Sequence, residues 1–168
     1  MSVSDRPEQL PVLAVTASSY YRAAGRITDL YHPARLIEGR KDFGGWISDL
    51  GCWDGAWLEF SFLHPVVLAA VEIVNGFVEE EPNRTRDDFY YHLRVRAAEI
   101  AADGAATPLA CLTFADAKTP QVFPFDRERR AEKVRLVVRD VHRLSPAGAI
   151  KPFDVVGLRS VEWRGRPD

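Results

Sequence analysis

Three tryptophans alternate with three carboxylates in one short stretch of the chain. In sequence order these residues are Trp46, Asp49, Trp53, Asp54, Trp57 and Glu59. Aromatic rings stack on the C–H faces of sugar rings, and carboxylates bind the hydroxyl groups. Because Gly51 and Gly55 bracket Trp53 and Asp54 in a loop-like segment, Trp53 is the best candidate for an exposed aromatic platform. In the alternative interpretation all three tryptophans belong to the core, which we favour for Trp46 and Trp57.

Other polar side chains could serve the same surface. Arg35 and Glu38 precede Gly39, which suits a left-handed turn, and Arg84 lies in a polar insertion at residues 79–88. Polar-tipped aromatic residues stand before this turn, namely Tyr20, Tyr21, Tyr31 and His32. The candidate ligand-binding residues are therefore Arg35, Glu38, Trp53, Asp54 and Arg84. A solvated insertion at 79–88 is the alternative for Arg84.

The residues that enzymes use for catalysis lack a catalytic context here. The four histidines, at positions 32, 64, 92 and 142, show no metal-ligand spacing. Ser18-Ser19 is not part of a nucleophile elbow, and Gly44-Gly45 is too short for a phosphate-binding loop. Cys52 could act as a nucleophile with His32 or His64, but a structural cysteine is commoner. We predict no catalytic residue and no metal ligand.

The composition is that of an ordinary soluble domain. At 168 residues, with 46% hydrophobic and 27% charged residues, the chain can bury a core without metals or disulfides. We predict a single domain over residues 1–168, with its core at about 12–164. Cys52 and Cys111 form neither a metal pattern nor a disulfide framework.

The charge and hydropathy patterns argue against nucleic acid and membrane as partners. A formal net charge of −2 disfavours nucleic-acid binding, which needs a basic face. The basic cluster Arg127, Arg129 and Arg130 is interrupted by Glu128, which favours a solvated turn. The N-terminus carries no apolar run of signal-peptide length, and no segment approaches the length of a membrane span. We expect a cytoplasmic protein.

Short β-branched and aromatic runs, separated by turn residues, indicate an all-β chain. Leu58 and Phe60 alternate with polar neighbours, as in a strand with one face on a core. Asn75-Gly76 and Asp103-Gly104 are turn signals, and His64-Pro65 also predicts a turn. The predicted strands cover residues 57–62, 66–74, 90–100, 109–114, 121–125, 134–138 and 155–163, with 134–138 central. A pattern of about eight short strands favours a sandwich or barrel.

Four motifs follow one another in a recognisable order between residues 15 and 77. They are Ala17-Ser18-Ser19, the segment PARLIEG at 33–39 with Trp46, the strand WLEFSF at 57–62 with Pro65, and Val71-Glu72-Ile73. Their order and spacing resemble the discoidin, or coagulation factor 5/8 type C, family of galactose-binding-like domains. The ending Asn75-Gly76-Phe77 is most similar to the sub-branch of bacterial NADase-type glycan-binding domains.

The resemblance implies a jelly-roll β-sandwich of antiparallel strands, with a ligand-binding rim of loops at one end and no catalysis. Many members hold calcium beside an Asp-Gly turn, but here Glu38 replaces the Asp and Arg35 replaces an Asn. Ser160 stands where a late acidic residue is expected, with Glu162 two positions on. Calcium takes six to eight oxygen ligands, and these replacements alter the ligands that the turn can offer. We therefore expect no cofactor. An ion pair of Glu38 with Arg35 or Arg40 is the alternative to a calcium site.

Two functions fit these patterns. The first is a non-catalytic module that binds a glycan or another small polar ligand through the loop rim. The alternative is a cytoplasmic protein–protein docking domain, such as an adaptor or immunity subunit, that uses the same rim for a protein partner. The lack of a signal-peptide pattern favours the second function, because most glycans lie outside the cell.

Overall fold

β-Strands make up most of the chain in the part that the computed structural model describes, which is residues 7–22, 31–39, 41, 44–78, 88–144 and 151–168. The elements are β1 (Glu8–Gln9), β2 (Val12–Ala17), η1 (Pro33–Ile37), β3 (Trp46–Ile47), β4 (Trp57–Asn75), η2 (Asp88–Tyr91), β5 (His92–Ala102), β6 (Ala110–Thr113), β7 (Gln121–His142) and β8 (Phe153–Pro167). The elements η1 and η2 are 3-10 helices. No helix in the described ranges is long and apolar enough to cross a membrane.

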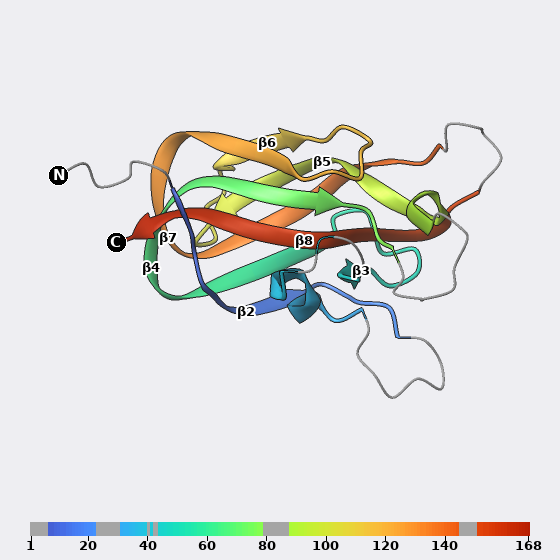
Figure 1. Cartoon of the computed structure of the whole chain (residues 1–168), viewed down its shortest axis with the longest axis horizontal. Helices are drawn as coiled ribbons and strands as arrows, with labels where there is room; N and C mark the ends of the chain where they lie inside the picture. Colours follow the sequence, from blue (N-terminus) through green and yellow to red (C-terminus); the bar gives the residue numbers. More distant parts are fainter. Residues whose placement is uncertain (1–6, 23–30, 40, 42–43, 79–87, 145–150) are drawn as a thin grey trace.

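Two long strands, β4 and β7, bend and pass through both layers of the molecule (Figure 1). The first part of β4 pairs with β2 and with the last part of β7, whereas its second part pairs with β8 and the first part of β7. The register of β4 against β7 shifts between Ser61 and Val66. Such a bulge bends a strand, and it accommodates Pro65, which has no N–H for the ladder.

These long strands correct two predictions. The sequence predicts separate strands at 57–62 and 66–74, with a turn at His64-Pro65, but both belong to β4. It also predicts separate strands at 121–125 and 134–138, but both belong to β7. The polar residues between the members of each pair lie on the bends, where the strand changes layer without ending.

The strands form a sandwich whose pairings are almost all antiparallel. Their hydrogen-bonded order is β1-β8-β4-β7-β5-β6, with β2 added to β4 and β3 added to β8. One short parallel pairing among the described residues, between β5 and β8, joins two strands that are not neighbours in this order. The prediction of an all-β, mostly antiparallel jelly-roll sandwich is confirmed, and the strand predicted at 134–138 is central, between β4 and β5.

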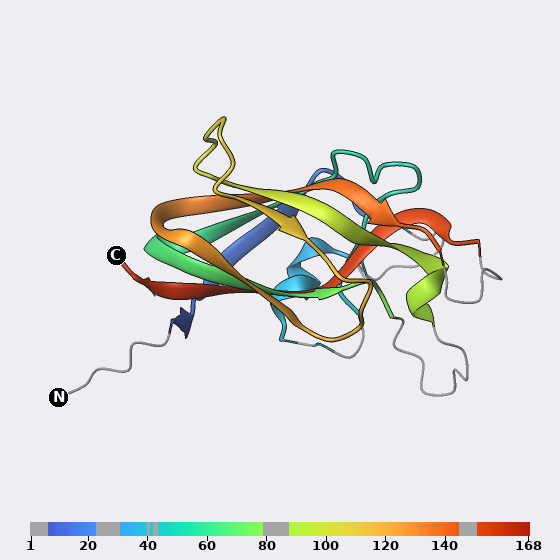
Figure 2. The same cartoon turned by 90° about the horizontal axis from the view of Figure 1, so that it is seen from above.

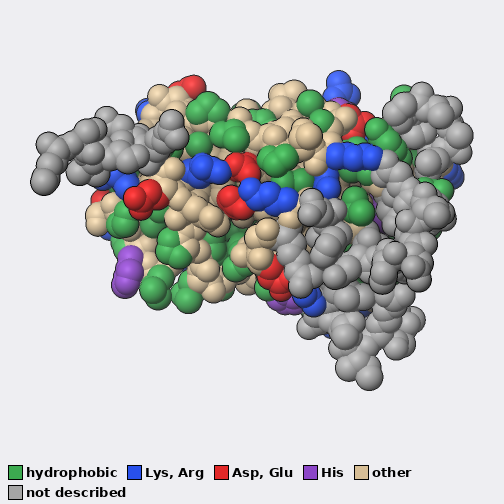
Figure 3. Space-filling model, viewed as in Figure 1, with side chains coloured by type: hydrophobic (Ala, Val, Ile, Leu, Met, Phe, Trp, Pro, Cys, Tyr) green, Lys and Arg blue, Asp and Glu red, His purple; other side chains and the backbone are tan. Residues whose placement is uncertain are grey.

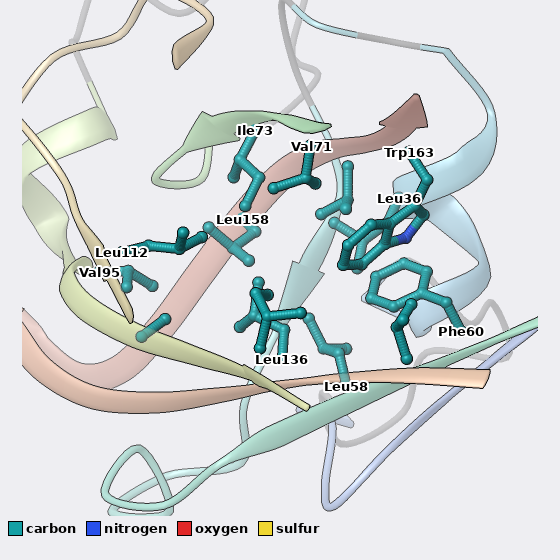
Figure 4. Close-up of a cluster of buried hydrophobic side chains, with 14 of the residues drawn as sticks. Leu36, Leu58, Phe60, Val71, Ile73, Val95, Leu112, Leu136, Leu158 and Trp163 are labelled. Atoms are coloured by element: carbon teal, nitrogen blue, oxygen red, sulfur yellow. The ribbon is translucent and has the colours of Figure 1, made fainter. Parts of the chain in front are cut away.

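Apolar side chains from both layers meet in the space between them (Figure 4). Leu58 and Phe60 point inward from β4, as their alternation predicts, and Leu136 meets them from β7. The ring of Phe60 packs edge-to-face on Trp163 of β8, with 5.3 Å between ring centroids. Burial of a large apolar side chain contributes roughly 1.5–3 kcal/mol to folding, so this cluster is the main source of stability.

Gly45 brings the short strand β3 against β8. It has φ +107°, and a Cβ atom there would lie 2.0 Å from the carbonyl oxygen of Leu158. Glycine is needed for both reasons, and it lets Trp46 pair with Leu158. Trp46 is fully buried, which confirms its core assignment, and its indole N–H donates to the carbonyl of Ser19 at 2.8 Å.

Acidic and basic side chains interleave on the outer face of β4 and β8 (Figure 3). Glu72 and Glu162 stand opposite each other on the two strands. The ammonium of Lys41 lies 2.6 Å from Glu72 and 3.1 Å from Glu162, and Arg164 lies 2.6 Å from Glu72. Lys41 lies between η1 and β3 in the sequence, so this charge cluster ties Lys41 to the sandwich.

Candidate functional site

Figure 2 shows residues 48–56, η2 and the start of β8 at one end of the sandwich, and the bends of β4 and β7 at the other. We call residues 48–56 the tryptophan loop. The hydroxyl of Ser19 accepts the N–H of Asp49 at 3.1 Å, and the hydroxyl of Ser18 accepts the N–H of Trp57 at 3.0 Å. The two serines of the Ala-Ser-Ser motif therefore hold both ends of this loop.

The other side of the tryptophan loop is fastened to β7 and β8. The N–H of Gly51 donates to the carbonyl of Asp154 at 2.8 Å, and the N–H of Gly55 donates to Val138 at 3.1 Å. Ser48 is fully buried, and its hydroxyl accepts the N–H of Val156 at 3.0 Å. Anchors on β7, on β8 and on the two serines after β2 give the loop a fixed shape, which lowers the conformational entropy lost when a ligand binds.

Trp53 is half-buried at the outer margin of the core. The guanidinium carbon of Arg143 lies 4.8 Å from the centroid of its ring, within the range of a cation–π contact. Asp54 is exposed beside it. Trp57 is also half-buried, outside the core cluster, and Arg135 covers its ring at 4.2 Å, so its predicted core position is wrong. Trp57 points away from the face that Leu58 presents to the core.

Large apolar side chains are exposed close to the tryptophan loop. Leu50 in the loop is 61% exposed, and Phe153, next to the residue that pairs with Gly51, is 62% exposed. We call Leu50, Trp53, Arg143 and Phe153 the apical patch. Exposed apolar side chains that adjoin charged groups are typical of binding surfaces.

A row of aromatic rings leads from Phe153 across the end of the sandwich. Ring centroids are 6.4 Å apart for Phe153 and His92, 5.3 Å for His92 and Phe77, and 5.4 Å for Phe77 and Tyr31. Tyr21 continues the row at 5.7 Å from Tyr31. The inner rings, those of His92, Phe77 and Tyr31, are buried, whereas Tyr21 and Phe153 are exposed. The row therefore reaches the protein surface at both of its ends.

The five predicted site residues do not form one surface. Trp53 and Asp54 share the tryptophan loop, but Arg35 and Glu38 flank the end of η1, and Arg84 lies outside the described residues. Gly39 lines a hollow with β8 residues 161–163, whereas Gly51 bonds to Asp154 near the start of β8. At about 3.3 Å per residue, these two levels of β8 are about 25 Å apart.

The turn at Glu38 does not offer calcium a suitable set of ligands. The carboxylate of Glu38 forms an ion pair with Arg35 at 3.3 Å, the alternative to calcium that the sequence predicts, and Glu162 is bound by Lys41. Among the described residues, no group of three or more His, Cys, Asp or Glu side chains comes together as a metal site. These residues do not fit an ion that takes six to eight oxygens, and the absence of a cofactor stays a prediction.

Two members of the apical patch were missed by the sequence reasoning. Arg143 follows β7 and Phe153 begins β8, far from the tryptophan loop in sequence. The register of β7 and β8 brings them there, and no short motif carries that information. The signal that was present is the pair Phe153-Asp154, a large apolar residue beside an acid at the start of a strand.

Comparison with known proteins supports the architecture. No family model matches the sequence, and no curated protein matches it. The structure is similar to the family 32 carbohydrate-binding module of C. perfringens NanJ in complex with galactose, with a TM-score of 0.63 and 13% identity over 90% of this chain and 92% of that one. It is also similar to a Bacteroides fragilis factor 5/8 type C domain, with a TM-score of 0.61 and 15% identity over 98% and 99% of the two chains. The chain has the discoidin-like fold.

A third discoidin-like structure agrees with these two. It is a family 32 module from Clostridium perfringens in complex with GalNAc-β-1,3-galactose, with a TM-score of 0.63 and 11% identity over 93% of this chain and 99% of that one. The resemblance inferred from residues 15–77 is therefore confirmed at the level of the fold, while the NADase-type sub-branch stays a prediction.

Proposed function

We propose that this discoidin-like chain is a non-catalytic module that binds a glycan at the apical patch. The observation that carries the proposal is the tryptophan loop, which Ser18, Ser19 and strands β7 and β8 hold in place with Trp53 and Arg143 stacked at its surface. Two discoidin-like structures of the same fold are complexes with galactose and with GalNAc-β-1,3-galactose. These complexes support a sugar as the ligand class.

The apical patch offers the two kinds of contact that sugars need. The ring of Phe153 and the edge of Trp53 can pack on the C–H groups of a pyranose. The guanidinium of Arg143 and the exposed carboxylates of Asp54 and Asp154 can bind its hydroxyls. These groups come from three segments of the chain, which are the tryptophan loop, the end of β7 and the start of β8.

The test is a glycan array followed by calorimetric titration of the best sugar. Trp53→Ala should weaken binding by about tenfold or more, since aromatic contacts of this kind contribute on the order of 1–2 kcal/mol. Trp57→Ala is the matched control, because Trp57 is also a half-buried indole under an arginine, but on the outer face of β4. Its affinity for the sugar should match that of the unmodified protein.

Two results would count against the proposal: binding to no glycan on the array, or equal losses of affinity in the two variants. The protein-docking alternative draws no support from the three similar structures. It would be favoured if the array were silent and the apical patch instead bound a protein in a manner that Trp53→Ala abolished.

A further inference from the structure

A second hollow lies at the end of the sandwich opposite the tryptophan loop. Its volume is about 370 Å³, within the range of small-molecule sites. It is lined by Ala102, Ala105, Ala106, Thr107, Pro108, Leu109, Arg127 and Arg129. These residues belong to the loop between β5 and β6 and to the bend of β7, which Figure 2 shows side by side, far from residues 48–56.

Arg127 and Arg129 bring two positive charges to this hollow without a negative partner. Arg129 stands opposite Leu68 on β4 and two residues before Ala131, so it shares their face, and Arg127 lines the same hollow. Both are exposed, and neither forms an ion pair within the described part of the chain. The charged residues next to them in the sequence do form ion pairs, Arg130 with Asp168 and Glu128 with Arg166. The basic cluster that the sequence assigns to a solvated turn is therefore divided between two faces.

The opposite wall of the hollow is fixed in place. Asp103 begins the loop with φ +48°, and its carboxylate accepts the N–H groups of Glu132 and Lys133, both at 2.9 Å. Leu109 closes the loop with a 2.6 Å hydrogen bond to Ile100. Within the described residues that carboxylate forms no ion pair with Arg127 or Arg129. The wall and the charges are thus present before any ligand arrives.

We propose that this hollow binds a carboxylated sugar, a uronic acid residue of an acidic glycan. A guanidinium binds a carboxylate through two parallel hydrogen bonds, and the second guanidinium can bind the neighbouring hydroxyl oxygens of the sugar. The wall of alanines, Pro108 and Leu109 fits the C–H face of a sugar ring, which an inorganic anion lacks. The site is separate from the apical patch and does not depend on the glycan that binds there.

The test uses tri-galacturonate as the probe and a neutral trisaccharide of galactose as its uncharged counterpart. NMR titration should shift the amide signals of residues 102–107, Leu109 and residues 127–129 with the charged probe only. The double variant Arg127→Gln, Arg129→Gln should weaken binding at least about tenfold, because bonds to charged groups are the strong ones. Raising the salt concentration should also weaken it, since both charges are exposed.

Arg130→Gln is the matched control, because it removes one positive charge from the opposite face of the same strand. The affinity of this variant for tri-galacturonate should equal that of the unmodified protein. Trp53→Ala should also leave uronate binding intact, so failure here and failure of the apical patch are distinguishable. The proposal is wrong if the uronate does not bind, if the double variant binds it as tightly while its melting temperature shows it is folded, or if inorganic phosphate shifts the same amides equally.

Discussion

At the scale of single residues, one buried amide joins the end of β4 to β5. Asn75 is fully buried, and its side chain exchanges hydrogen bonds with the backbone of Val95, at 2.7 Å to the carbonyl and 2.9 Å from the N–H. The side-chain oxygen of Asn75, which accepts the N–H of Val95, also accepts the N–H of Gly76 at 2.9 Å. The side chain thus replaces a peptide group where β4 stops and β5 continues.

Replacement of Asn75 by Leu should lower the free energy of unfolding by about 3 kcal/mol, because it leaves several buried backbone groups without partners. Gln121→Leu is the control, since Gln121 makes the same pair of bonds to Ala115 in an exposed setting where water can replace it. That loss should be about 1 kcal/mol. Urea denaturation measures both, and equal losses would show that burial of the amide is not the cause.

At the scale of elements, the charge cluster between β4 and β8 makes stability depend on pH. The hydrogen bond from Lys41 is the main cause that lowers the pKa of Glu72, and the same bond raises the pKa of Lys41. The contribution of Glu72 is present above its ordinary pKa of 4.5 and is lost as pH falls through the lowered value. The contribution of Lys41 is present below 10.5 and is lost as pH rises through the raised value.

Lys41→Met should lower stability at neutral pH by about 1–2 kcal/mol, because two adjacent carboxylates lose a shared partner. It should also flatten the fall in melting temperature below about pH 4.5, since the pKa of Glu72 returns toward its ordinary value. Lys133→Met is the control, because Lys133 is 59% exposed and 4.0 Å from Glu59. Parallel pH profiles for Lys41→Met and the unmodified protein would contradict this account.

The elements also show what a sequence can and cannot predict. Alternation gave the inward face of Leu58 and Phe60 correctly, because a strand with one buried face must alternate. The sequence wrongly predicted a turn at His64-Pro65 in place of a continuous β4, because a bulge and a turn use similar residues. Glycines predicted the loop of Trp53, but Arg143 and Phe153 join it only through the register of β7 and β8, which depends on the whole sandwich.

At the scale of the whole molecule, β4 and β7 run through both layers and leave neither layer able to form alone. We therefore expect unfolding to be one cooperative transition. Urea curves followed by tryptophan fluorescence, which reports on buried Trp46 and Trp163, and by far-ultraviolet circular dichroism should coincide. Separate midpoints for the two probes would mean that one layer persists without the other.

The described ends of the chain lie beside each other, because β1 pairs with the last residues of β8 at the end opposite the tryptophan loop (Figure 1). A protein attached to a sensor chip through Asp168 would therefore turn its apical patch toward the solution. The hollow at Arg127 and Arg129 would face the chip instead. Coupling through the exposed Cys52 in the tryptophan loop, with Cys111 replaced, would reverse this orientation. The hollow would then face the solution and the apical patch would face the chip.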